Sequence, residues 1–166
     1  KATFKDYWYS RLNEEYAEIS FKRGVNTLDI GESIAHYRKA ISYDASHAIS
    51  YNNLGFALMK KGNTSEAISQ LKKAVELKPD FALAHENLGV AQMKKGNNNE
   101  AILSYKMAIK LNPDFAVAHY NLGIILANKG STSEAISQLK RAIELKPDYA
   151  EAHNNLKIAI SREENH

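Results

Sequence analysis

The sequence predicts an all-α protein, a solenoid of stacked antiparallel helix hairpins. One observation is a repeat, because the stretch YNNLGFALMKKG at Tyr51–Gly62 returns with substitutions at His85 and at His119, each time after 34 residues. A fixed period of this length indicates a repeat architecture. The second observation is regular punctuation by glycine and proline, and the third is that no alternating strand pattern occurs in the 166 residues.

The first predicted element is an N-terminal helix of residues 1–23. Apolar side chains recur in it at three- and four-residue spacing, which is typical of one stripe on a helix. They are Phe4, Trp8, Leu12, Tyr16 and Ile19. Gly24 is expected to end this helix, and a connector over Gly24–Gly31 leads to a second helix over Glu32–Tyr43. Residues 1–47 are therefore predicted to form a divergent N-terminal hairpin.

Three regular repeats follow, each with two predicted helices. They span residues 48–81, 82–115 and 116–149, and residues 150–166 are expected to form a capping helix with a polar outer face. In each repeat a Lys-Gly pair ends the first helix and a proline ends the second. An Asn or Ser three residues before a Glu predicts an N-cap for the second helix of each repeat. An Asp after each proline predicts an N-cap for the first helix of the following repeat. The predicted caps are Asn63, Asn97, Ser131, Asp80, Asp114 and Asp148.

Glycine recurs in the middle of each regular first helix, at Gly55, Gly89 and Gly123. Glycine in a helix interior costs about 1 kcal/mol relative to alanine. A close approach of the partner helix would offset this cost, and we expect it opposite the alanines of the second helix. In the divergent hairpin, Ala17 falls where the other repeats have this glycine.

The pattern resembles the tetratricopeptide repeat, whose motif has Leu-Gly in its first helix, alanines in its second and a closing proline. Residues 48–149 match at nearly every signature position, residues 150–162 match the first helix, and residues 10–47 match loosely. The resemblance implies a right-handed superhelix, expected as a single domain over residues 1–166. It also implies a concave groove, lined by the first helices, that binds a peptide segment of another protein.

The resemblance assigns groove-facing places to individual residues. The sixth place of the motif holds asparagine in every copy, and the other places hold mostly apolar side chains together with two lysines. The predicted peptide-binding residues are Asn52, Asn53, Phe56, Met59, Lys60, Leu83, Asn87, Val90, Met93, Lys94, Tyr120, Asn121, Ile124 and Asn155.

The asparagine column Asn53, Asn87, Asn121 and Asn155 has two interpretations. An amide carries both donors and an acceptor, so a ladder of amides can hydrogen-bond a peptide backbone whatever its side chains are. This is the favoured interpretation. In the alternative, asparagine belongs to the repeat consensus and bonds to its neighbours within the protein.

No arrangement typical of an enzyme occurs, and no catalytic residue, metal or cofactor is predicted. The sequence has no cysteine, no phosphate-binding glycine loop and no dinucleotide fingerprint. His85, His119 and His153 form a column, but equivalent positions on successive hairpins are about 10 Å apart, too far for ligands of one zinc ion. Packing or surface roles are expected for them. The Lys and Asn pair with which one subset of the family clamps a C-terminal carboxylate is absent from the corresponding places.

The composition favours a protein or peptide partner over nucleic acid or a membrane. The net charge is +3 and the lysines are spread through the repeats, which is typical of a solvated face. No apolar run approaches the ~18 residues of a membrane span, and none resembles a signal sequence. A soluble protein is expected, cytoplasmic rather than exported. Because the chain begins at Lys1, it is expected to be a fragment or a processed form.

Three functions are consistent with this pattern. The leading hypothesis is a non-catalytic interaction scaffold that binds a peptide segment of a partner in its groove. The second is self-assembly, by end-to-end stacking or by docking of the aromatic residues Phe4, Tyr7, Trp8 and Tyr9 into another copy. The third is a substrate-recruiting domain of a larger enzyme.

Overall fold

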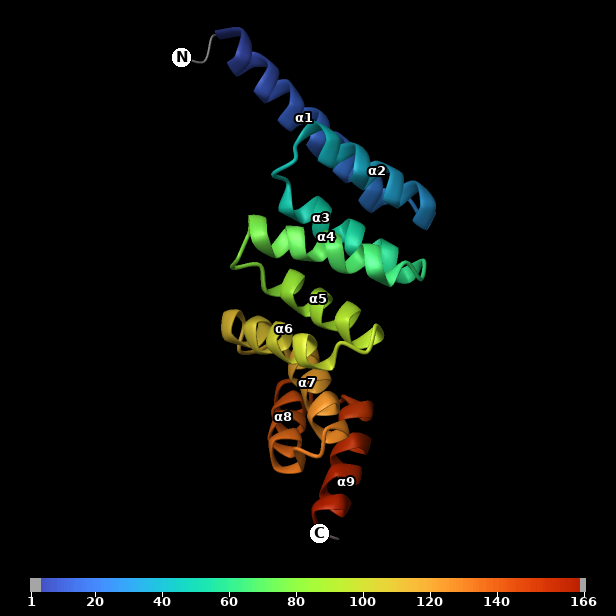
Figure 1. Ribbon diagram of the computed structural model, residues 1–166, viewed down its shortest axis with the longest axis vertical. Helices are drawn as coiled ribbons and strands as arrows, with labels where there is room; N and C mark the ends of the chain where they lie inside the picture. Colours follow the sequence, from blue (N-terminus) through green and yellow to red (C-terminus); the bar gives the residue numbers. More distant parts are fainter. Residues whose placement is uncertain (1–3, 165–166) are drawn as a thin grey trace. The chain divides into compact units, whose positions relative to one another are not determined.

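The computed structural model describes residues 4–164, with side chains from Trp8 onward. This part of the chain folds into helices joined by short turns and contains no strand. In chain order the helices are α1 (Phe4–Asn26), α2 (Ile30–Tyr43), α3 (Ala48–Lys60), α4 (Thr64–Leu77), α5 (Ala82–Lys94), α6 (Asn98–Leu111), α7 (Ala116–Asn128), α8 (Thr132–Leu145) and α9 (Ala150–Glu164) (Figure 1). None of them is long and apolar enough to cross a membrane.

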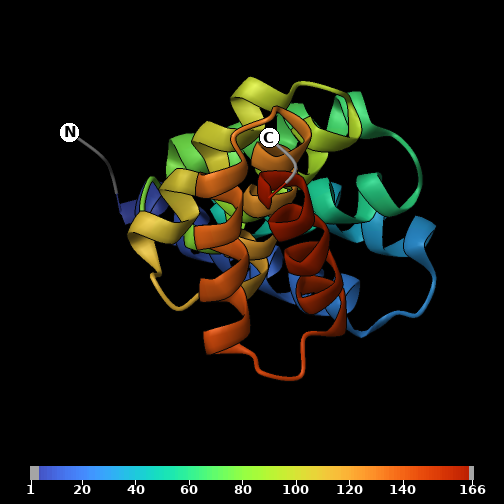
Figure 2. The same cartoon turned by 90° about the horizontal axis from the view of Figure 1, so that it is seen from below.

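Consecutive helices pair as hairpins. The pairs are α1 with α2, α3 with α4, α5 with α6, and α7 with α8, and α9 packs beside α8 (Figure 2). The chain divides into two compact units, Lys1–Pro79 with α1 to α4 and Asp80–His166 with α5 to α9. The expectation of a single domain over residues 1–166 stays a prediction.

Each unit has a core of its own. In the first unit Ile34, Leu54 and Leu71 are buried. In the second, Tyr105 and Leu122 belong to one buried cluster, to which α6, α7 and α8 contribute, and a further cluster links α8 to α9. The regular spacing of apolar residues in the repeats supplies these side chains, so the pattern that predicts the helices also predicts the core.

The mid-helix glycines lie where two helices approach most closely. A Cβ added to Gly55 would lie 2.5 Å from Leu71 Cγ and 3.2 Å from the Ala67 carbonyl oxygen. A Cβ added to Gly89 would lie 2.6 Å from Tyr105 Cε1. Interiors packed to this density have no room for the extra carbon. The predicted close approach is confirmed.

α1 differs from its predicted form. The helix continues through Gly24 to Asn26 and does not end at Gly24. A Cβ added to Gly24 would lie 2.7 Å from Tyr37 Cε1 of α2, so Gly24, and not Ala17, makes the close approach in the first hairpin. Both expectations were wrong because the packing of Tyr37 against the bare backbone outweighs the low helix propensity of glycine.

The glycines that end α3, α5 and α7 have the expected left-handed backbone. Gly62, Gly96 and Gly130 have φ values of +87°, +84° and +82°. After α3, the N–H of Asn63 donates to the carbonyl of Leu58 over 2.9 Å, a bond typical of this helix ending. The predicted helix ends are confirmed at these three turns.

The predicted side-chain N-caps of the second helices do not form. Asn63, Asn97 and Ser131 occupy the N-cap positions, but no side-chain hydrogen bond is made and their ψ values are 58°, 63° and 64°. By contrast, Asp29 before α2 has a ψ of 121° and accepts the Glu32 N–H over 2.8 Å. An extended cap residue directs its side chain over the first turn, and the regular repeats lack that backbone geometry.

The predicted aspartate caps of the first helices were also wrong. The N-cap residues of α5 and α7 are Phe81 and Phe115, one residue after the aspartates, and they make no side-chain cap bond. Before α9, Tyr149 accepts the N–H of Ala152 over 3.0 Å, which is the same backbone bond that Phe81 accepts. The turn after each proline is thus one residue longer than expected, and it brings an aromatic residue to the cap position.

Candidate functional site

The first helices of the repeats carry the predicted binding residues. In the second unit α5 contacts α7, and α7 contacts α9, so three such helices lie in a row. The Asn121 side-chain N–H donates to Glu86 Oε1 over 3.4 Å, and the Asn155 side-chain N–H donates to Tyr120 Oη over 3.3 Å. Each asparagine therefore reaches the fifth-place side chain of the preceding repeat.

These bonds use only the donor side of the amides. Asn155 also donates to the carbonyl of Glu151 over 2.8 Å, and no recorded bond uses the side-chain oxygen of Asn121 or Asn155 in the described chain. The alternative interpretation, in which asparagine bonds to its neighbours, thus accounts for the N–H groups at these two positions. The oxygens stay available as acceptors.

In the first unit, Asn53 and Phe56 line a hollow between α3 and the α1–α2 hairpin. The hollow has a volume of about 290 Å³. Its lining residues are Gly24, Val25, Thr27, Ile30, Ser33, Tyr37, Asn53, Phe56 and Ala57. Asn53 accepts the Asn52 side-chain N–H over 3.0 Å, and Lys60 Nζ lies 5.4 Å from the centre of the Phe56 ring.

The predicted binding residues fall into three groups by burial. Asn52, Met59 and Asn87 are buried, and their role in binding stays a prediction. The half-buried group packs partly against the cores and consists of Asn53, Val90, Met93, Tyr120, Asn121, Ile124 and Asn155. The exposed group consists of Phe56, Lys60, Leu83 and Lys94.

Glu86 of α5 is the buried carboxyl group of this region. Its side chain is only 7% exposed, and its one recorded hydrogen bond is the 3.4 Å contact with Asn121. Burial raises the pKa of Glu86 to about 7. The Tyr105 hydroxyl is buried with no hydrogen-bond partner, and burial together with the Glu86 charge raises the pKa of Tyr105 well above its usual value.

Two tyrosines extend this region towards α9. The rings of Tyr120 and Tyr149 lie 4.7 Å apart, and Lys146 Nζ lies 5.0 Å from the centre of the Tyr149 ring. Burial, and then the charges of Tyr120, Glu151 and Glu86, raise the pKa of Tyr149 to about 12. The tyrosines are therefore neutral hydroxyls near pH 7.

Sequence reasoning did not select Glu86, Tyr105 or Tyr149 as binding residues. One signal was present in the sequence, because Glu86 occupies a groove-facing place where the neighbouring repeats have Asn52 and Tyr120. Tyr105 and Tyr149 lie outside the first helices, so the motif gave them no binding role.

The histidine column ties the proline turns to the following helices. His119 Nε2 lies 3.0 Å from the Pro113 carbonyl oxygen, and His153 Nε2 lies 2.9 Å from that of Pro147. His119 Nδ1 is also within 2.7 Å of Gln138 Oε1. These contacts favour the expected packing role. Among the described residues, no group of three His, Cys, Asp or Glu side chains is placed to hold a metal ion.

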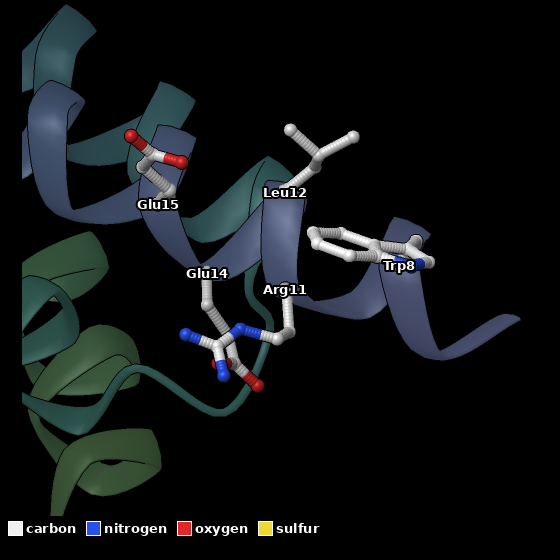
Figure 3. A pocket seen from close by; sticks show the side chains of 5 residues that line it. All are labelled: Trp8, Arg11, Leu12, Glu14 and Glu15. Atoms are coloured by element: carbon white, nitrogen blue, oxygen red, sulfur yellow. The ribbon is translucent and has the colours of Figure 1, made fainter. Parts of the chain in front are cut away.

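α1 carries a second exposed feature. A shallow hollow of about 340 Å³ is lined by Trp8, Arg11, Leu12, Glu14 and Glu15, which all belong to this one helix (Figure 3). In Figure 3 Leu12 points away from the helix, on the opposite side from Arg11 and Glu14. Trp8 and Tyr9 of the predicted aromatic cluster are exposed, whereas the side chains of Phe4 and Tyr7 lie outside the described residues.

Solved structures with the same fold come from repeat proteins. The structure of MamA is 30% identical in sequence, with a TM-score of 0.77 over 81% of this chain and 79% of that one. YrrB, described as a TPR protein with an unusual peptide-binding site, is 25% identical, with a TM-score of 0.72 over 95% of this chain and 77% of its own. The first TPR of Spaghetti (RPAP3), bound to an HSP90 peptide, is 24% identical, with a TM-score of 0.69 over 72% of this chain and 94% of its own.

The family comparison agrees with these structures. No curated protein sequence matches the chain. The family described as TPR repeat matches residues 29–62, 57–96, 92–130 and 125–156, which together span more than half of the chain. The predicted fold class, an all-α solenoid of helix hairpins, is confirmed. The chain therefore belongs to the TPR repeat family.

Proposed function

We propose that this chain is a non-catalytic protein-interaction scaffold whose first helices bind a peptide segment of a partner. The observation that carries the proposal is a large apolar side chain exposed at the second place of three successive first helices. Ile49, Leu83 and Val117 are 41%, 45% and 40% exposed. Leu83 and Val117 belong to α5 and α7, which contact each other, and apolar side chains exposed on adjacent helices are typical of an interaction surface. The similarity to YrrB, described as having a peptide-binding site, supports the same role.

Polar groups on the first helices also suit an extended peptide. The side-chain oxygens of Asn121 and Asn155 have no recorded donor, so they can accept backbone N–H groups of a ligand. The hollow beside Asn53 and Phe56 has a volume of about 290 Å³, enough for an apolar side chain. Asn121 and Asn155 would thus act through their oxygens, with their N–H groups engaged in the protein.

Peptides selected from a display library on the wild-type protein provide the probe, and fluorescence anisotropy measures their affinity. Replacing Leu83 and Val117 together by serine is expected to weaken binding by about tenfold or more, because each buried apolar side chain contributes about 1.5–3 kcal/mol. Leu103→Ser is the matched control, since Leu103 is 69% exposed on the second helix α6. Equal weakening by the control, or no effect of the double variant, would contradict the proposal.

The asparagine oxygens require a separate test. Replacing Asn121 and Asn155 by alanine is expected to weaken binding of the same peptides, because a backbone hydrogen bond contributes about 0.5–1.5 kcal/mol. Circular dichroism checks that the helices persist. If affinity stays within about twofold, the amides serve only the contacts within the protein.

A second candidate function is self-assembly through α1. Trp8, Leu12, Tyr16 and Ile19 are exposed at four- and three-residue spacing, so they form one apolar face of the helix. Light scattering of the wild type and of a Trp8→Glu/Leu12→Glu variant tests this function. A dimer or larger species that the variant loses would support it, and a wild-type monomer at every concentration would remove it.

A further inference from the structure

Glu86 is a carboxyl group without a cation. It is 7% exposed, and no Lys, Arg or His of the described chain forms a recorded ion pair with it. Its contact with Asn121, at 3.4 Å, is long for a hydrogen bond and comes from a neutral amide. Removing an ion from water costs several kcal/mol unless a partner offsets it. The ionised form of Glu86 therefore lacks the partner that buried carboxylates usually have.

A second buried polar group at this position is also unsatisfied. The Tyr105 hydroxyl is fully buried and has no hydrogen-bond partner. Its ring packs against Gly89, one turn after Glu86 on α5, and the Glu86 charge acts on the hydroxyl. A buried hydroxyl without a hydrogen-bond partner destabilises the folded state. Glu86 and the Tyr105 hydroxyl are thus two buried polar groups whose charge or hydrogen-bonding capacity is not matched within the described residues.

The surroundings attract positive charge. Tyr120 and Tyr149 offer aromatic faces, and Glu151 on α9 adds a second carboxylate that acts on both tyrosines. Rings of this kind attract ammonium and guanidinium groups. Lys146 already lies over the Tyr149 ring, yet it forms no recorded ion pair with Glu86 or Glu151 within the described residues.

From these observations we infer that this region is a specificity pocket for a basic side chain, Lys or Arg, of the peptide that the scaffold binds. The pocket is named here the Glu86 cluster and comprises Glu86, Tyr105, Tyr120, Asn121, Tyr149 and Glu151. The ligand's N–H groups donate to the Glu86 carboxylate and to the Asn121 side-chain oxygen, and Glu151 adds attraction from α9. The inference rests on the proposed function, because the basic side chain arrives as part of a bound peptide.

Binding of a cation has a consequence for protons. A positive charge beside Glu86 stabilises its ionised form, so binding near pH 6 expels the proton that Glu86 holds there. Other titratable groups of this region are the hydroxyls of three tyrosines, one further carboxyl group and one lysine. They are Tyr105, Tyr120, Tyr149, Glu151 and Lys146. The tyrosine pKa values are raised, so these hydroxyls do not exchange protons in this range.

The test uses short capped peptides of one apolar sequence in which only the central residue changes, between Lys, Arg and norleucine. Isothermal titration at pH 8 measures their affinity for the full chain. The Lys and Arg peptides are expected to bind about tenfold or more tightly than the norleucine peptide, because hydrogen bonds between charged groups are stronger than those between neutral groups. Glu86→Gln is expected to bring the ratio close to one, and Glu151→Gln to lower it.

Glu134→Gln is the control, since Glu134 is exposed on the second helix α8, and it should leave the ratio unchanged. A second readout is proton release by the wild type at pH 6, taken from binding enthalpies in two buffers of different ionisation heat. This readout stands even if Glu86→Gln does not fold. Equal affinity for the three peptides overturns the inference and leaves the scaffold function intact. Binding of none of them overturns both.

Discussion

At the scale of single residues, Glu86 has a different charge in the folded and the unfolded chain near pH 6. Burial raises its pKa from 4.5 to about 7. The folded protein therefore holds a proton that the unfolded chain has already lost. This contribution to stability is fully present below about pH 4.5 and is lost as the pH rises through 7.

Glu86→Gln should remove that pH dependence. The variant is expected to be more stable than the wild type above pH 7, by about 1–3 kcal/mol in the free energy of unfolding, because glutamine carries no charge to bury. Below about pH 4.5 the two proteins should be similar. Urea unfolding followed by circular dichroism measures the difference, with Glu134→Gln as the exposed control. If the difference in unfolding free energy between the variant and the wild type does not change with pH, burial does not raise the pKa of Glu86.

At the scale of elements, α1 is the helix with the least support. It has 23 residues and α2 has 14, so their lengths are about 34 Å and about 21 Å. The N-terminal part of α1 extends beyond α2 (Figure 1). Every described side chain from Trp8 to Tyr16 is exposed, and Ala17 is the first buried one. Helical structure without a buried face depends on propensity alone, which is marginal in water.

Hydrogen exchange should therefore divide α1 into two parts. Amides up to Tyr16 are expected to exchange much faster than those from Ala17 to Asn26, which pack against α2. Mass spectrometry of peptic fragments resolves the two parts. If the first part is as protected as the second, the experiment is repeated at a lower protein concentration. Protection that falls on dilution would mean that a second copy covers this part. Protection that does not change on dilution would mean that this part is stable by itself.

At the scale of the whole molecule, the chain holds two compact units, and each of them buries apolar side chains. In repeat proteins stability is roughly a sum over repeats and their nearest interfaces. A defect in one unit is therefore expected to act mainly on its own helices.

Leu54→Ala provides the test, because Leu54 is buried in the first unit. Replacing a buried leucine by alanine costs about 2.7–5 kcal/mol. The free energy of opening measured by hydrogen exchange should fall by this amount for the amides in α2 to α4. For the amides in α6 to α8 it should change less. Leu122→Ala is the matched variant for the second unit and should show the reverse. Equal loss in both units for either variant would mean that the chain unfolds as one cooperative body.

Much of this fold follows from the sequence because repetition tests each prediction several times. Gly62, Gly96 and Gly130 end their helices as expected, since only glycine takes a positive φ without strain. The first hairpin was predicted less well, because Gly24 had no second copy to show that it packs on Tyr37. The predicted side-chain N-caps of the second helices do not form, because the residue type alone does not determine the ψ angle that such a cap needs.

The candidate site was less predictable than the fold. The motif indicates which places face a groove, but it does not indicate how deeply each side chain is buried, so Asn52 and Phe56 could not be distinguished. Glu86 contacts Asn121, which lies 35 residues later in the chain, and no local sequence pattern indicates such a contact. The repeat 82–115 nevertheless differs from its neighbours, with Tyr105 where they have Leu71 and Leu139. The tyrosine at this position brings a hydroxyl group on which the charge of Glu86 acts.

The glycine turns have a consequence for how this chain can change in length. No described atom lies within 4 Å of a Cβ added to Gly62, Gly96 or Gly130, whereas the mid-helix glycines are tightly surrounded. Exposed turns without packed neighbours are where insertions are tolerated best. New segments are therefore accommodated between the two helices of a hairpin, where they would add loops at its turn and leave the packed cores as they are.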